Sequence, residues 1–191
     1  MLTDRIIGAL TFRREVYADV EHDTSFTQTA WLIVAVVAFL NQLGANAGNG
    51  FAGWIVGSFL GTLFAILGFA AGAFVIAAVA KSLFNADVSF DEMVRTLGLA
   101  YIWSIVGVVG IVGRLSPALG CLLTPASILA ALLGLIAWFI AAKEALDLDW
   151  GGTIISVIIG WVILLIITFI GGLILGIFGL GASAVGNIIG I

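Results

Sequence analysis

Residues 51–80 read FAGWIVGSFLGTLFAILGFAAGAFVIAAVA, and no side chain in this stretch is charged. A run of about twenty apolar residues is long enough to cross a bilayer as an α-helix. The stretch therefore predicts a transmembrane helix that ends at Lys81. As one helix it would measure about 45 Å, against a hydrocarbon core of about 30 Å. We expect either that its first turns lie outside the core or that it bends at a glycine. If it were instead two half-spans, the later loops would lie on the opposite sides of the membrane.

The composition of the whole chain fits the same environment. Of its 191 residues, 62% are hydrophobic and 9% are charged, whereas about 25% of the residues in soluble domains are charged. The chain has room for about five membrane spans. Its net charge of −4 argues against a nucleic-acid partner, because nucleic acid requires a basic surface. Cys121 is the single cysteine, so the chain forms no internal disulfide.

We expect an all-α polytopic membrane protein with five transmembrane helices and an N-terminal amphipathic surface helix. Residues 1–26 are predicted to form this cytoplasmic amphipathic segment, because apolar residues recur there at helical spacing beside a charged face. A solvated charged arm is the alternative. A membrane domain over 27–176 and a glycine-rich tail over 177–191 follow. The five spans are predicted at about 27–43, 52–80, 96–112, 126–142 and 153–174.

Two local patterns predict where helices begin. Ser89 and Glu92 have the spacing of a capping box, with serine at the N-cap and glutamate at the third helical position. Thr124 and Pro125 predict a second start, with threonine as the cap and proline at the first helical position. These starts belong to the third and fourth spans.

The basic residues predict how the spans are oriented, because lysine and arginine gather on the cytoplasmic side of membrane proteins. With five spans and a cytoplasmic N-terminus, six of the seven basic residues lie inside and only Arg114 lies outside. The acidic residues also fall inside, so one face of the protein is highly charged and the other is almost neutral. The basic residues predicted to lie inside are Arg5, Arg13, Arg14, Lys81, Arg95 and Lys143.

Glycines spaced by four predict faces where another helix approaches closely. Such a face either packs within the chain or docks on another subunit, and both interpretations stay open. Three tryptophans lie well inside their spans, where the indole N–H needs an acceptor or the ring needs another ring. Another subunit, a lipid or a hydrophobic cofactor would supply one. The predicted packing and docking residues are Gly53, Gly57, Gly61, Gly68, Gly72, Gly172, Gly176, Trp103, Trp138 and Trp161.

Motifs that carry chemistry are missing from the sequence. It contains no HExxH, no GxSxG, no P-loop and no metal-binding spacing of cysteine and histidine. The predicted spans also hold no charged residue between their caps, whereas an enzyme in the membrane needs ionisable groups there. We therefore predict no enzymatic activity, no metal site and no required cofactor, although a lipid or a hydrophobic pigment could bind.

His22 is the only histidine and the one candidate for cofactor binding, through a metal or the magnesium of a chlorophyll-type pigment. The alternative is a polar residue of the juxtamembrane turn, hydrogen-bonded near Asp23 or to lipid headgroups. Other polar residues form a predicted cytoplasmic interaction face. The alternative is an ordinary helix cap with an ion pair for Asp91, Glu92 and Arg95, and a solvated helix end at Asp147. This face comprises Glu21, Asp23, Asp91, Glu92, Arg95 and Asp147.

Three short stretches carry a resemblance to a known family. The first is FRREV at 12–16, followed by EHDT at 21–24 just before the first span. The second is RTLGLAY at 95–101, which enters the third span. The third is Trp138 with EALD at 144–147, at the end of the fourth span.

Together these stretches resemble the Yip-domain family of small five-span membrane proteins, over about residues 5–170. Many members carry a proline shortly after the Leu-Gly-x-Ala of the third span, where Ile102 and Trp103 stand here. For eukaryotic members the resemblance implies Rab GTPases and vesicle traffic, whereas for prokaryotic members it implies fold and topology. The lack of a soluble N-terminal extension argues against a trafficking role, and we expect a prokaryotic member in the inner membrane.

These observations lead to three hypotheses of function. We expect a non-catalytic accessory or assembly subunit that docks on a larger membrane complex, with a respiratory or photosynthetic complex as one host. The first alternative is a small membrane transporter or permeation pathway. The second is a membrane adaptor for a cytoplasmic GTPase or another soluble partner. The expected partners are the lipid bilayer and other membrane protein subunits.

Overall fold

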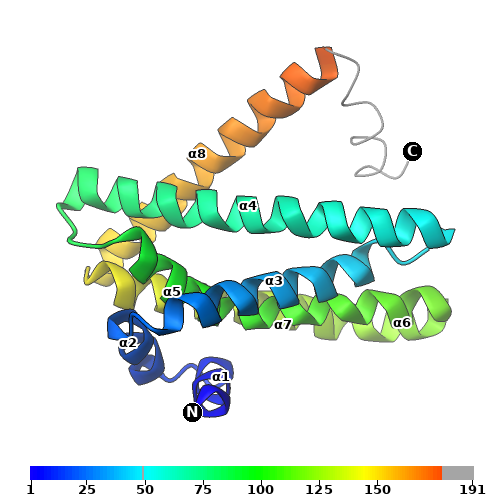
Figure 1. Ribbon diagram of the computed structural model, residues 1–191, viewed down its shortest axis with the longest axis horizontal. Coiled ribbons are helices and arrows are strands. Elements are labelled where there is room, and N and C mark those ends of the chain that lie inside the picture. The colour runs from blue at the N-terminus through cyan, green and yellow to red at the C-terminus, as the bar shows by residue number, and fades with distance from the viewer. Residues whose placement is uncertain (49, 178–191) are drawn as a thin grey trace.

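The computed structural model describes residues 1–48 and 50–177, and every regular element within these ranges is a helix (Figure 1). The long helices lie side by side along one direction, and α8 leaves the bundle obliquely (Figure 1). The elements in chain order are α1 Leu2–Leu10, α2 Arg14–His22, α3 Phe26–Ala45, α4 Gly50–Phe84, α5 Phe90–Ala100, the 3₁₀ helix η1 Tyr101–Val109, α6 Gly110–Leu115, α7 Pro117–Leu146 and α8 Trp150–Ile177.

Four helical segments of the described chain are long and apolar enough to cross a membrane. The first part of α8, Trp150–Ile163, is a shorter apolar helix. The expectation of an all-α polytopic membrane protein is therefore confirmed. α4 is one continuous helix of 35 residues, about 52 Å long, so the structure does not divide it into half-spans. The four long segments are Phe26–Ala45, Gly50–Phe84, Phe90–Arg114 and Ala118–Leu146.

The N-terminal segment consists of two short helices, and the turn between them begins after α1 ends at Leu10. The N–H of Arg13 donates to the Gly8 carbonyl at 2.9 Å, and that of Phe12 donates to the Ala9 carbonyl at 3.4 Å. This is the Schellman pattern of a helix end, which places Phe12 in the left-handed region at φ 58°. That conformation is strained for a bulky residue, and the Phe12 ring stacks on Trp103 at a centroid distance of 5.5 Å.

The prediction of a helix start at Thr124 and Pro125 is wrong. α7 begins at Pro117, where the missing N–H of proline costs no hydrogen bond, and it continues through Pro125. The Thr124 hydroxyl donates to the Gly120 carbonyl at 2.8 Å inside the helix, so it does not act as a cap. Membrane helices tolerate an internal proline because neighbouring hydroxyls and helices compensate for the freed backbone groups.

The third span changes its winding instead of following one α-helix. It runs as α5, then nine residues of 3₁₀ helix in η1, then α6, and a 3₁₀ stretch of this length within a span is uncommon. The change begins at Tyr101, next to Ile102 and Trp103, where many Yip-domain proteins carry a proline. Its backbone lies very close to α3, because a Cβ on Gly44 would stand 1.9 Å from the Gly107 carbonyl oxygen.

α5 is the central helix at the end of the bundle where α2 ends and α5 begins, which we call the charged end. All residues from Met93 to Ala100 are buried, and they pack against α2, α3, α4 and α7. The predicted capping box is formed: the Glu92 N–H donates to the Ser89 hydroxyl at 3.2 Å, and the Ser89 N–H donates to Glu92 Oε2 at 2.6 Å. The capping box determines where α5 starts, and the burial of Met93–Ala100 determines its position in the bundle.

Candidate functional site

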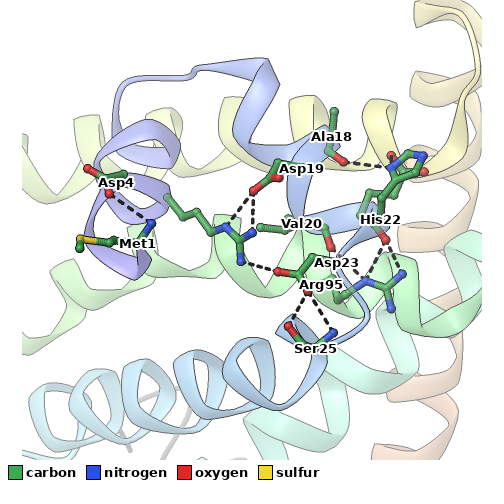
Figure 2. Close-up of polar contacts among 11 residues, drawn as sticks. Met1, Asp4, Ala18, Asp19, Val20, His22, Asp23, Ser25 and Arg95 are labelled. Atoms are coloured by element: carbon green, nitrogen blue, oxygen red, sulfur yellow. Dashed lines mark hydrogen bonds and ion pairs between the residues drawn. The ribbon is translucent and has the colours of Figure 1, made fainter.

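Arg95 lies at the centre of the charged end and is only 4% exposed. Its Nε donates to the carbonyls of Val20 at 3.0 Å and Glu21 at 2.9 Å, and its Nη2 also donates to the Glu21 carbonyl (Figure 2). Its Nη1 donates to the Thr27 hydroxyl at 3.2 Å. One guanidinium therefore joins α5 to the last turn of α2 and to the first turn of α3.

The partners of Arg95 are backbone carbonyls and one hydroxyl, not a carboxylate. The last carbonyls of a helix have no partner within it and carry the negative end of the helix dipole. A buried guanidinium satisfies both requirements, because it is positively charged and presents several N–H groups in a rigid fork. No ion pair among the described residues includes Arg95. The positive charge is thus stabilised by the end of α2, and α2 is held by that charge.

Glu21 supplies one of these carbonyls, and its own side chain is also buried, at 8% exposure. The pKa of Glu21 is raised from 4.5 to about 7, first by burial and then by the negative charge of Asp147, against a lowering by His22. Glu92 and Glu144 act in the same direction as Asp147. The end of α2 is therefore a place where one carboxyl changes its charge near neutral pH.

A second set of contacts holds α1 to the start of α3. Arg5 Nη2 pairs with Asp19 at 2.6 Å, and Arg5 Nη1 pairs with Asp23 at 2.8 Å. Asp23 also accepts hydrogen bonds from the Ser25 hydroxyl and N–H (Figure 2). The bonds from Ser25, followed by those from Arg5, lower the pKa of the Asp23 carboxyl. α1, α2 and the first turn of α3 thus form one connected unit with α5.

The structure places His22 on the surface at the end of α2, with a side chain that is 80% exposed. Its Nδ1 lies 3.0 Å from the Ala18 carbonyl oxygen and 3.9 Å from a Glu21 carboxylate oxygen. Within 1–48 and 50–177, no three His, Cys, Asp or Glu side chains are grouped so that they could hold a metal ion. A cofactor role for His22 therefore gains no neighbouring ligand from the described fold.

The six residues of the predicted interaction face do not all reach the surface. Arg95 and Glu21 are buried, so their side chains cannot contact a partner directly. They can affect a partner only by holding α2 in place. Asp91 and Asp147 are exposed, and Asp147 ends α7 in the left-handed conformation at φ 49°. Glu92 is half-buried because it caps α5. Sequence reasoning placed Arg95 among surface charges because its partners lie 68 to 75 residues away.

The structure shows which of the predicted glycines contact another helix of the chain. A Cβ on Gly57 would stand 2.6 Å from Asn46, and one on Gly61 would stand 2.4 Å from Gln42, so both face α3 within the chain. A Cβ on Gly68 would meet no atom within 4 Å. Of the remaining positions, Gly72 is buried and Gly53 is exposed, whereas Gly172 and Gly176 lie in the part of α8 whose side-chain surroundings are outside the described residues, as is the predicted tail beyond residue 177.

The three mid-span tryptophans all have partners within the chain. The Trp103 Nε1 donates to the Ala9 carbonyl at 3.4 Å, and its ring stacks on Phe12. Trp138 and Trp161 contact each other, with ring centroids 5.8 Å apart. These rings therefore do not require a partner subunit, lipid or cofactor, and they hold α1 to η1 and α7 to α8.

A partly open cavity of about 320 Å³ lies between α3, η1 and α7. Asn41 of α3 and Ser104 of η1 are its polar lining residues, and the Asn41 Nδ2 donates to the Ser104 carbonyl at 2.9 Å. Trp103 and Trp138 line its wall. The signal in the sequence was the interruption of an apolar run at Asn41, but its partner could not be read from the sequence.

The sequence matches the Yip1 domain over residues 7–172. No curated protein and no solved structure matches the chain.

Replacing Arg95 by methionine should loosen α2. Arg95→Met leaves the buried Val20 and Glu21 carbonyls without donors, and an unsatisfied buried polar group costs about 1–3 kcal/mol. Faster hydrogen exchange in 14–22 and a lower Tm in detergent are the expected results. Lys81→Met is the matched control, because Lys81 is exposed on α4 and no ion pair or cation–π contact among the described residues includes it. Unchanged exchange in α2 would show that Arg95 does not hold it.

The stability of the charged end should fall as pH rises from about 4.5 to about 7. The pKa of Glu21 is about 7 in the folded chain, against 4.5 for the ordinary group. Between these values the folded state binds more protons than the unfolded state, so raising the pH favours unfolding. Hydrogen exchange of α2 measured across this range checks the slope. Glu21→Gln should flatten it, and an equal slope in the variant would assign the effect to another group.

Proposed function

The chain belongs to the Yip1 domain family, and we propose that it is a non-catalytic accessory protein that docks on a larger membrane assembly. The observation that supports this function is the open glycine face of α4. Phe64, Gly68 and Ala71 lie on one side of that helix, and all three are exposed. Gly68 has open space where its neighbours Gly57 and Gly61 meet α3.

Helices in lipid associate through close backbone approach at small residues, because no hydrophobic effect drives them together there. Gly44, Gly57 and Gly61 already serve this purpose between α3 and its neighbours, and each would clash if it carried a Cβ. Gly68 lies in the same helix as Gly57 and Gly61 but contacts no other helix among the described residues. A helix of another protein could therefore pack closely against it. The exposed ring of Phe64, which is 70% exposed, would give that helix an apolar contact.

The proposed location is the prokaryotic inner membrane, with the charged end in the cytoplasm. The support is the distribution of basic residues, since six of seven lie in segments of the charged end and only Arg114 lies at the opposite end. Lysine and arginine are retained on the cytoplasmic side during insertion. In this orientation α2 lies at the cytoplasmic end, whereas α1 runs across the direction of the long helices beside η1, where the Ala9 carbonyl accepts from Trp103 (Figure 1).

Replacing Gly68 by leucine should release the protein from its assembly. The new side chain fills space that is open within the chain, so it blocks a partner helix without disturbing the monomer. The measurement is the mass and subunit content after extraction from the native membrane in a mild detergent. The wild type should migrate in a large complex and Gly68→Leu as the free protein.

Ala126→Leu is the matched control, because Ala126 is exposed on α7 and the change adds a similar side chain to another lipid-facing helix. Gly57→Leu is unsuitable, since its side chain would strike Asn46 and damage the contact between α3 and α4. A wild-type protein that migrates alone, or a Gly68→Leu variant that stays in the complex, would contradict docking through this face.

A permeation pathway is the second candidate function, and the cavity beside Asn41 favours it. Transporters place polar groups and interrupted helices near the middle of the membrane, and here a polar pair lines a cavity next to the 3₁₀ stretch of the third span. If this function holds, liposomes that contain only the purified protein should take up a small solute, and Asn41→Leu should reduce the flux. Equal flux in empty liposomes would remove this candidate.

A further inference from the structure

A groove of about 720 Å³ opens between α6 and α7, at the end of the bundle opposite the charged end. The two helices touch where their connection turns, because a Cβ on Gly120 would stand 3.2 Å from the Gly113 Cα. Beyond that contact the facing residues stay small, and the space between the helices is not filled. The residues with the smallest side chains along the groove are Gly110, Gly113, Gly120, Ser127 and Ala131.

The walls of the groove are largely apolar, although two hydroxyl groups line it. The Thr124 hydroxyl donates to the Gly120 carbonyl at 2.8 Å, and the Ser127 hydroxyl donates to the Leu123 carbonyl at 3.0 Å. Both protons are therefore used within α7. Ala131 lines both this groove and the cavity beside Asn41, so the two spaces lie on either side of one small residue of α7.

Arg114 lines the outer part of this groove and is exposed. No ion pair among the described residues includes it, because all eleven acidic residues lie in 4–23, 87–92 and 144–149. Its side chain lies over Gly48 at the turn between α3 and α4, 3.5 Å from where a Cβ would be. The described structure thus holds an unpaired cation at the surface end of an apolar groove.

We propose that this groove binds one anionic phospholipid, with its phosphate at Arg114 and an acyl chain along α6 and α7. A basic side chain near the membrane surface attracts an anionic headgroup, and the volume is within the usual range of a ligand site. A free phosphate ion would leave the apolar groove empty. An apolar partner helix would cover Arg114 without supplying a counter-charge. A phospholipid matches both the charge and the apolar walls.

The test measures which lipid stays bound to the full-length protein. The protein is purified in mild detergent, incubated with phosphatidylglycerol or phosphatidylcholine, and analysed by native mass spectrometry. The wild type should retain phosphatidylglycerol in preference to phosphatidylcholine. Arg114→Gln should lower the retention of phosphatidylglycerol about fivefold, the effect of one basic residue near an anionic lipid surface. Equal retention of both lipids by the wild type would overturn the proposal.

Two further variants separate the charge from the groove. Lys81→Gln removes one basic charge at the charged end, so it should leave phosphatidylglycerol retention unchanged; a loss equal to that of Arg114→Gln would assign binding to total charge. Ser127→Leu narrows the groove and gives up only a hydrogen bond within α7. It should reduce the retention of both lipids while the helical circular dichroism stays that of the wild type. Unchanged retention in Ser127→Leu would place the lipid elsewhere.

Discussion

The charged end of this protein depends on one buried guanidinium. Arg95 cannot leave its site without exposing its charge to an apolar interior, and the last carbonyls of α2 cannot lose it without becoming unpaired acceptors. Because α5 is covered on all sides, the position of Arg95 is fixed by the core, and α2 is placed in turn. The N-terminal helices are therefore part of the folded unit, and the stacked pair of Phe12 and Trp103 fastens them a second time.

The same arrangement makes the charged end sensitive to protonation. Arg95 attracts the end of α2, while Glu92, Glu144 and Asp147 surround the buried Glu21 carboxyl with negative charge. Burial and these negative charges favour the neutral form of Glu21, because burial removes the water that would solvate the ionised form. α2 thus lies between a strong attachment and a carboxyl whose charge changes near pH 7. A partner that binds the exposed Asp91 or Asp147 would bind next to α2, whose attachment depends on Arg95 and on the charge of Glu21.

Within the membrane, glycine decides which surfaces are closed and which stay open. Gly44, Gly57, Gly61 and Gly107 bring backbones or short polar side chains into contact, so α3 is tightly enclosed by α4 and η1. Gly68 and the groove between α6 and α7 have no such neighbour in the described chain. These two open surfaces differ in charge, because one is wholly apolar and the other ends at Arg114. That difference is why one fits a membrane helix and the other a lipid with an anionic headgroup.

The sequence by itself determined the features that depend on neighbouring residues: the membrane environment and the all-α fold from hydropathy, and the start of α5 from the spacing of Ser89 and Glu92. It was wrong at Pro125, because a local start signal cannot tell that surrounding helices allow α7 to continue. Only the tertiary structure decided the partner of Arg95, the burial of Glu21, and which glycines meet another helix. Each of these depends on how helices distant in sequence pack together. The sequence of a helix that is apolar on all sides does not indicate which side faces its neighbours.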